Sequence, residues 1–267
     1  MYSHLKKLYS PIGGIGMGSL GVSHVASTQA AAAVVGFTPD KIADCQFWFT
    51  VEEGIESGGD GTVITSWASQ VGTLFAGNAT ANQRPTFNTT HVTFDGGDSL
   101  DFFEDVDLST TTEITLDTSD GGWTVIAIYT DGDWDAAAAA LFGVTGNTQN
   151  FLRHNADSSG TDRYRIKAAN NQAQIALDSG LTDDRYYSIM VTCAADAGLL
   201  LYVDNVAQAD DAQALTNNTK DFTIGGLAQK AGSDLLSGHA KHFIAYDRIL
   251  TDAERDQIQD WANGFVG

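Results

Sequence analysis

The stretch HFIAYDRILTDAERDQIQDWANGFV, residues 242–266, passes from a strand pattern into a helix pattern. Apolar residues crowd the segment 240–247, which predicts a strand. Thr251 then supplies an N-cap, and Glu254 supplies its capping-box partner. Gly264 offers a left-handed stop to the helix. One face of that helix carries the apolar residues Ile258, Trp261 and Phe265. We therefore expect a single C-terminal helix packed on a body of strands.

Upstream of this stretch the chain consists of short apolar segments separated by turn residues such as Asp95-Gly96-Gly97. Further strands are predicted at 46–51, 62–67, 91–94, 123–130, 140–144, 163–168, 172–177, 186–193, 199–204 and 221–226. Many short strands at this spacing are typical of a sandwich or jelly roll. The predicted fold is all-β, a two-sheet antiparallel jelly-roll sandwich with one short C-terminal helix and an extended N-terminal arm. The expected core between the sheets includes Trp67, Phe94, Phe102 and Phe243.

The charge balance limits the partners of the protein. The chain has 34 acidic and 14 basic residues in 267, a formal net charge of −20. Such a field repels nucleic acid and anionic membranes, so we expect neither as a partner. The two cysteines, Cys45 and Cys193, form neither a disulfide framework nor a CxxC metal site. Cys193 lies in an apolar run and is expected in the core.

The N-terminal segment differs from the rest in composition. Residues 1–40 are rich in Gly and Ala, and we separate them as an arm from a domain at 41–267. Gly16, Gly18 and Gly21 have the spacing of a dinucleotide-binding fingerprint, but no strand leads into them, so we expect no phosphate-bearing ligand. The segment is also a poor signal peptide. Its glycines suit a main chain that lies along or pairs with a neighbouring subunit. The residues assigned to this assembly arm are Pro11, Gly13, Gly14, Gly16, Gly18 and Gly21.

Several motifs together resemble the concanavalin A-like lectin/glucanase superfamily, specifically its laminin-G-like jelly-roll domains. The stretches VITSWASQVG (63–72), ATANQRPTFN (79–88) and VTFDGGDSLDF (92–102) look like the W…RPT…FDG-x-D-x-L signature of these domains. The segments at 123–129 and 186–205 look like the central strands and hairpin, and 221–226 with 242–266 look like the closing strand and helix. The resemblance covers 46–266. It implies the sandwich fold and places the domain among modules of phage virion and bacterial surface proteins.

The acidic residues do not match the catalytic cluster of this superfamily. Its glucanases carry E-x-D-x-x-E on one strand, and the nearest acidic string here, 104–109, lacks that spacing and the second Glu. Glu52 and Glu56 would lie about 13 Å apart along one strand, too far for a retaining or inverting pair unless Gly54 bends the chain. We therefore predict that the protein is not an enzyme and has no catalytic or cofactor-binding residues.

Two histidines and three aspartates are candidate metal ligands. His239 and His242 would face opposite sides of one strand, so a metal site there would need a bulge. Asp131, Asp133 and Asp135 alternate in TDGDWDA (130–136), as in a calcium loop, but the Gly and Glu that a helix–loop–helix site requires are missing. The three are the candidates for a Ca²⁺ ligand set, and an exposed acidic loop is the alternative.

Trp134, at the tip of the same loop, is the candidate for stacking on a sugar ring, against the alternative of a Trp folded under its own loop.

The functional hypotheses belong to different classes. The first is a non-catalytic virion structural protein, a head-decoration, fibre or tail-associated subunit, whose residues 1–40 bind other virion, capsid or tail proteins. The second is a carbohydrate-binding or adhesion module for host-surface glycans, and a glycoside hydrolase ranks third. The expected locations are the outer surface of a virion or, alternatively, the extracellular space or cell surface. A homo-oligomer is expected.

Overall fold

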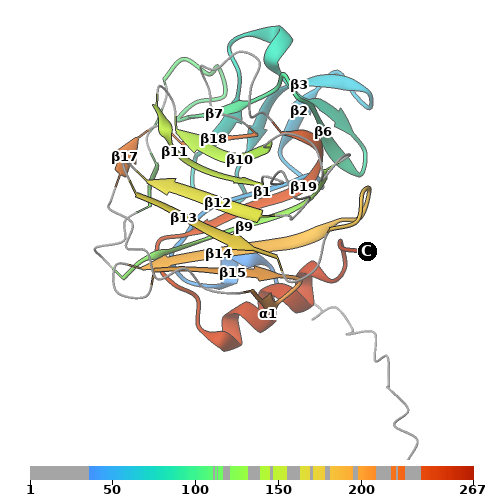
Figure 1. Cartoon of the computed structure of the whole chain (residues 1–267). Helices are drawn as coiled ribbons and strands as arrows, with labels where there is room; N and C mark the ends of the chain where they lie inside the picture. The colour runs from blue at the N-terminus through green and yellow to red at the C-terminus, as the bar shows by residue number, and fades with distance from the viewer. Residues whose placement is uncertain are drawn as a thin grey trace, which may run out of the picture. The chain divides into compact units, whose positions relative to one another are not determined.

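Figure 1 shows the computed structural model of the chain. The structure describes residues 36–110, 112, 114–116, 121–131, 139–144, 147–154, 163–168, 171–177, 181–194, 198–208, 218–220, 222–225 and 236–267. All of them belong to one compact unit, residues 31–267. The assembly-arm residues from Pro11 to Gly21 lie outside the described residues.

Most strands form a two-sheet antiparallel sandwich, which confirms the predicted all-β fold. The first sheet, called here the helix-side sheet, has the strand order β16-β15-β14-β9-β19. The far edge of β19 pairs with β1 over one half and with β6 over the other, and β5 follows β6. Its strands are β1 (Cys45–Thr50), β5 (Thr86–Asn88), β6 (His91–Asp95), β9 (Trp123–Asp131), β14 (Tyr187–Ala194), β15 (Gly198–Val203), β16 (Val206–Ala207) and β19 (Ser237–Tyr246).

The second sheet, called here the opposite sheet, has the order β13-β12-β11-β10-β18-β7-β4-β3-β2. Its strands are β2 (Ile55–Ser57), β3 (Thr62–Ala68), β4 (Phe75–Gly77), β7 (Leu100–Phe103), β10 (Ala139–Val144), β11 (Asn147–His154), β12 (Arg163–Ala168), β13 (Asn171–Ala176) and β18 (Phe222–Ile224). Strand β3 also pairs with β5, so it joins the two sheets at one end. A separate ribbon pairs β8 (Ile114–Leu116) with β17 (Asn218–Lys220).

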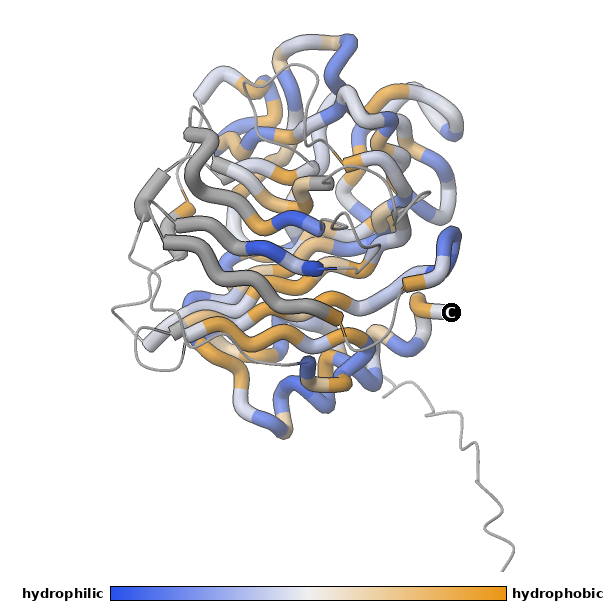
Figure 2. Tube along the Cα trace, viewed as in Figure 1, coloured by the Kyte–Doolittle hydropathy of each residue, from blue (hydrophilic) through white to orange (hydrophobic). Residues whose placement is uncertain are grey.

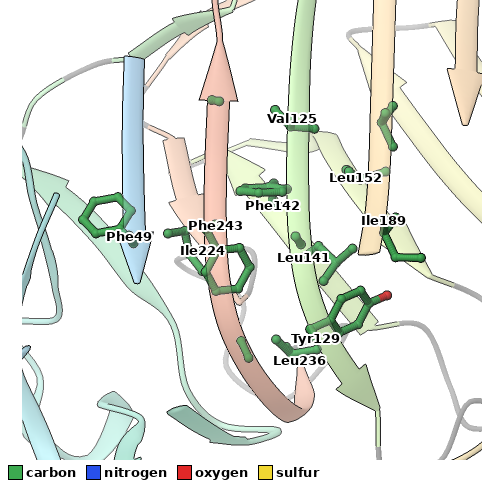
Figure 3. Packing of buried hydrophobic residues seen from close by; sticks show 14 of the residues in the cluster. Phe49, Val125, Tyr129, Leu141, Phe142, Leu152, Ile189, Ile224, Leu236 and Phe243 are labelled. Atoms are coloured by element: carbon green, nitrogen blue, oxygen red, sulfur yellow. The ribbon is translucent and has the colours of Figure 1, made fainter. Parts of the chain in front are cut away.

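The main core fills the space between the two sheets. Phe49, Val125 and Phe243 from the helix-side sheet meet Leu141, Phe142 and Ile224 from the opposite sheet (Figure 3). The predicted core residues Trp67, Phe94, Phe102 and Phe243 are all buried, and Cys193 is buried in the same cluster.

A second apolar layer lies between the helix-side sheet and α1 (Asp252–Ala262), with the short 3₁₀ turn η1 (Pro39–Lys41) beside it. Trp48, Ile244 and Ile258 are buried there. This layer arises because alternate residues of β1 and β19 face opposite sides of the sheet, and both sides are apolar. The other 3₁₀ turn, η2 (Ala81–Gln83), lies between β4 and β5.

The C-terminal helix begins as predicted and ends differently. The Thr251 side chain accepts from the backbone N–H of Glu254, whose carboxylate accepts from the backbone N–H of Thr251, so the capping box is complete. The predicted left-handed stop at Gly264 is wrong. The helix is followed by Asn263 in right-handed geometry, and Gly264 is not among the described residues with positive φ. No helix among the described residues is long and apolar enough to cross a membrane.

Candidate functional site: an arginine-bearing sheet face

Three arginines lie together on β11 and β12 of the opposite sheet. Arg153 is paired in register with Arg165, and Arg163 is two positions from Arg165 on the same strand. The residues next to them in sequence, Leu152 and Tyr164, belong to the core between the sheets. Because successive side chains on a strand point to opposite faces, the three arginines lie on the outer face of the opposite sheet. We call this the arginine face.

A contact across the sandwich supports β12 beneath the arginines. The hydroxyl of Tyr164 hydrogen-bonds with that of Tyr129 on β9, and both side chains are buried. The buried ring of His154 packs edge-on against Tyr164, with 5.5 Å between ring centroids. Tyr164 lies between Arg163 and Arg165, so the two arginines project from a backbone segment that is fixed to the other sheet.

The arginine face contrasts with the charge of the whole chain. Strands β10, β11, β12, β13 and β18 contain no Asp or Glu, although the chain carries 34 acidic residues. Lys167 is a third basic residue on β12, opposite Phe151 in the register. Figure 2 shows the hydrophilic stretches of β11 and β12 side by side at the same end of these strands. These strands therefore contribute basic residues and no acidic ones to the sheet.

The arginine side chains are packed yet reach solvent. Arg153, Arg163 and Arg165 are each half-buried, and the Nε of each is shielded from solvent. Each also makes a further interaction within the chain. The one α-helix of the described residues, α1, covers the helix-side sheet instead. The guanidinium groups are thus held in place on a face that no described helix covers.

The chemistry of this face is that of binding. Arginine stays protonated at physiological pH and presents its N–H donors in a planar fork that matches carboxylate, phosphate and sulfate oxygens. The Cβ atoms of directly opposed residues on antiparallel strands lie about 5 Å apart, so Arg153 and Arg165 can approach one ligand group together. A permanently charged fork donates hydrogen bonds but does not exchange protons in a reaction. The face therefore suits recognition of an oxygen-rich ligand.

The residues predicted for metal and sugar binding fall largely outside the described part. Asp131 ends β9, where its backbone pairs with Gly238. Asp133, Asp135 and Trp134 lie outside the described residues, so the calcium and stacking assignments stay predictions. Within the described ranges, no group of three or more His, Cys, Asp or Glu is placed to hold a metal ion.

The carboxylates considered for catalysis do not share a strand. Glu52 follows β1, Glu56 lies in β2, and Gly54 between them has φ +82°, so the chain turns there. The single extended strand assumed for the 13 Å estimate is absent at this point, because the glycine bends the backbone. Glu56 accepts a hydrogen bond from the Ser66 hydroxyl at 3.3 Å. Both carboxylates are on exposed residues.

The predicted opposite orientation of His239 and His242 is wrong. The register of β19 against β9 shifts between Ala240 and His242, which is a bulge. The two histidines therefore pair with Thr130 and Ile128, two positions apart on β9 and on one face. The rings nevertheless engage different partners: His239 stacks on His91, and His242 packs against aromatic side chains beneath the C-terminal segment.

Comparison with known proteins shows the fold. No protein-family model matches the chain, and no curated protein sequence does either. Among solved structures, the Trypanosoma rangeli sialidase in complex with sialic acid aligns with a TM-score of 0.59 at 15% identity, over 85% of this chain and 34% of that chain. The same sialidase with 2,3-difluorosialic acid, described as a covalent intermediate, aligns with a TM-score of 0.58 at 15% identity, over 88% of this chain and 36% of that chain. A mutant of it displaying trans-sialidase activity aligns with a TM-score of 0.56 at 15% identity, over 84% of this chain and 34% of that chain. This chain therefore spans about a third of the length of these proteins and shares a β-sandwich fold with part of them.

These matches overturn two predictions. The prediction of a non-catalytic virion structural protein is wrong, and so is the prediction that the protein is not an enzyme, because the matched structures are sialidases rather than virion components. The prediction that the protein is not an enzyme rested on the missing pair of catalytic carboxylates. Sialidases are glycoside hydrolases that use a tyrosine nucleophile, so a missing carboxylate pair does not bear on them. The expected homo-oligomer, arm partners and location stay predictions.

The arginine face is not among the sites predicted from the sequence. The strand predicted at 163–168 is β12, but its alternating basic residues were assigned no role. No strand was predicted at β11, which carries Arg153. The available signal was the concentration of four of the 14 basic residues between positions 153 and 167.

Proposed function

We propose that this β-sandwich is a laminin-G-like glycan-binding domain that serves a glycan-processing enzyme of the sialidase kind. The observation that carries the proposal is the arginine face, a donor-rich surface on the sheet that α1 does not cover. Sugars present many hydroxyl oxygens and often carboxylates or sulfates, and these are the acceptors that such a surface would bind.

The comparison supports the proposal at the level of fold. The sialidases that share this sandwich are recorded with sialic acid and its difluoro derivative. Because this chain spans only about a third of their length, the enzymatic activity of the whole protein is part of the proposal. The role proposed for the described sandwich is to hold the glycan.

A glycan array with the full chain tests the proposal. We expect selective binding to a subset of glycans, with dissociation constants in the micromolar to millimolar range typical of single carbohydrate sites, about −4 to −8 kcal/mol. The array should be run with and without added calcium, because the loop 130–136 stays a predicted calcium ligand set. Absence of binding to any glycan in both conditions would end the proposal.

A hydrolysis assay tests the enzymatic part separately. The full chain is incubated with fluorogenic sialosides and with neutral fluorogenic glycosides, and release of the fluorophore is followed. Turnover that co-purifies with the folded protein supports an enzyme in which the sandwich and the chemistry share one chain. Binding without turnover of any substrate would assign the chemistry to a partner.

A further inference from the structure

We infer that His91 and His239 together hold a divalent transition-metal ion, of the zinc, copper and nickel group, on the outer face of the helix-side sheet. The two imidazole rings are stacked, with 4.1 Å between ring centroids and 25° between ring planes. The pair lies on the helix-side sheet, whereas the arginine face belongs to the opposite sheet. The inference is therefore independent of the proposed glycan-binding function.

Strand pairing puts the two histidines on one face. His239 on β19 is directly opposite Thr93 on β6, and His91 is two positions from Thr93 on the same strand. The neighbours of Thr93 in sequence, Val92 and Phe94, belong to the core between the sheets. Because successive side chains alternate between faces, the two histidines lie on the outer face as diagonal neighbours. Both are partly exposed, so an ion in solution can reach them.

The separation of the rings suits a shared ion. Imidazole nitrogens bind Zn²⁺ at about 2.0–2.1 Å, so two of them on a tetrahedral ion lie about 3.4 Å apart. Rings whose centroids are 4.1 Å apart can bring one nitrogen of each to that distance by turning about their Cβ–Cγ bonds. Two imidazolium cations would repel each other at this contact, so the stack favours a neutral ring. The neutral ring is the form that binds a metal.

Thr90 orients the ring of His91. Its hydroxyl oxygen lies 3.1 Å from Nδ1 of His91. With the proton on Nδ1, the ring donates to Thr90 and keeps the lone pair of Nε2 for a metal ion. Metal-binding histidines are held in the same way, by a hydrogen bond from the second ring nitrogen. The contact with Thr90 therefore assigns Nε2 of His91 as the ligating atom.

The surrounding charges suit a cation. A net charge of −20 attracts cations, and the negative charge of Asp60 acts on the ring of His91. Asp60 is held beside this hairpin because it accepts from the backbone N–H and the hydroxyl of Thr89, at 2.7 and 3.0 Å. The ammonium group of Lys241 also acts on His91, but it is already engaged, since it donates to the backbone carbonyl of Phe265 at 2.8 Å.

Two imidazole ligands select the class of ion. Imidazole suits Zn²⁺, Cu²⁺ and Ni²⁺, whereas Ca²⁺ and Mg²⁺ prefer oxygen ligands. Among the described residues, no third His, Cys, Asp or Glu completes a ligand set. A four-coordinate ion would therefore keep two positions for water or for an oxygen or nitrogen of a bound molecule. We expect weaker binding than at a closed structural zinc site.

A calorimetric titration tests the inference. The full chain is treated with a chelator, exchanged into buffer and titrated with ZnCl₂, NiCl₂ and CuCl₂ in turn. Excess CaCl₂ is present throughout, so that any site built from oxygen ligands is filled beforehand. We expect saturable binding of one ion to the histidine pair. Electron paramagnetic resonance of the Cu²⁺ form should show coupling to two ring nitrogens.

Variants locate the ion. His91→Ala and His239→Ala should each weaken binding at least about tenfold and remove one nitrogen from the Cu²⁺ spectrum. The matched control is His242→Phe, which removes a fully buried histidine of the same strand and should leave binding unchanged. Thr90→Val should cause a smaller loss, and Thr90→Ser, which keeps the hydroxyl, should restore binding. Thermal unfolding of the metal-free variants separates loss of fold from loss of binding.

Each outcome decides the inference. Binding that both folded His→Ala variants lose and that His242→Phe keeps supports it. Absence of saturable binding of all three ions to the wild type would overturn it. Binding that survives in either folded His→Ala variant would show that the ion is not shared by the pair, and would also overturn it. The glycan array is scored separately, so the proposed glycan-binding function can fail or stand whatever these titrations give.

Discussion

His242 is a buried base in an apolar setting. It is fully buried on β19, and its ring lies 4.7 Å from that of Trp261 and 4.2 Å from that of Phe265, centroid to centroid. Neither ring nitrogen hydrogen-bonds to any residue in the described part of the chain. Burial, with the charge of neighbouring Lys241 as a second cause, lowers the pKa of His242 to about 3. The ring is therefore neutral in the folded protein at neutral pH.

Acid should destabilise the fold through this residue. Between its unfolded pKa of about 6.5 and its folded pKa of about 3, the unfolded chain binds one more proton at His242. Stability therefore rises with pH in this window, and is lost as pH falls through it by up to about 1.4 kcal/mol per pH unit. Urea unfolding at pH 7, 6, 5 and 4 measures the slope.

The variant His242→Phe isolates this effect. It keeps the aromatic contacts and removes the titrating group, so we expect unchanged or higher stability at pH 7 and a shallower slope below pH 6. The pH slope of the wild type alone does not isolate His242, because Asp98 changes the slope with the opposite sign. Burial raises the pKa of Asp98 to about 6, so its contribution makes stability fall with rising pH between about 4 and 6. Equal slopes in wild type and variant would contradict the role of His242.

Gly225 is a position where any side chain would clash. It follows β18 with φ +79°, and a Cβ there would overlap the ring of Phe94 in the core. We expect Gly225→Ala to cost about 2–5 kcal/mol, from the left-handed backbone and from overpacking together. The matched control is Gly96→Ala, at φ +84° with only ordinary contact to Ser237 at 3.7 Å. It should cost about 1–2 kcal/mol. Similar losses of urea-unfolding free energy in the two variants would rule out the overlap with Phe94.

At the scale of elements, the start of α1 joins three segments of the chain. The guanidinium of Arg248 donates to both carboxylate oxygens of Glu254, at 2.8 and 2.7 Å, and also pairs with Asp44 at 3.3 Å. The hydrogen bond from Arg248 is the first cause that lowers the pKa of Glu254 to about 2. The same carboxylate completes the capping box with Thr251.

Removing the charge of Glu254 should loosen the helix start. We expect Glu254→Gln to reduce the free energy of unfolding by about 1 kcal/mol at pH 7, because it weakens a cap and a charge-assisted contact together. The wild-type contribution is present above about pH 4.5 and is lost as pH falls toward 2, so the two proteins should converge in acid. Gln257→Ala, an exposed substitution in the same helix, is the control. A difference that persists unchanged at low pH would refute the assignment.

How well the sequence predicts the structure differs from element to element. The capping box was found because cap chemistry is local, and the boundaries of β12 were found because apolar and basic residues alternate there. Strand β11, NTQNFLRH, was missed because it is mostly polar, and its pairing with β10 and β12 makes it a strand. The bulge at Lys241 is a tertiary feature without a local signal, so the face of His242 was misplaced.

For the whole molecule, the Tyr129–Tyr164 contact is a polar link between the sheets. Tyr129→Phe or Tyr164→Phe should each cost about 1 kcal/mol or more, because a buried hydroxyl loses a partner. The double variant should cost less than the sum of the two, since neither hydroxyl is then left behind. Urea unfolding of the four proteins completes the cycle, and strict additivity would show that the two hydroxyls do not interact.

The arginine face itself could not be found by pattern alone. Arg153 and Arg165 are 12 positions apart in sequence, and only the antiparallel register brings them opposite each other. The metal and stacking candidates were chosen from a contiguous segment, which is where sequence reasoning is strongest. A site made by strand pairing depends on topology, and so it appeared only in the structure.

Because both sheets share β3, the two layers of the sandwich are harder to separate at the β3 end than at the other end. Where β3 pairs with both β5 and the strands β2 and β4, separation of the layers requires breaking a common strand. At the other end of the opposite sheet, β13 has β12 as its one neighbour among the described strands. Amide hydrogens of β13 should therefore exchange through partial opening that leaves intact both the β3 end and β12, whose Tyr164 is bonded to Tyr129 of the other sheet.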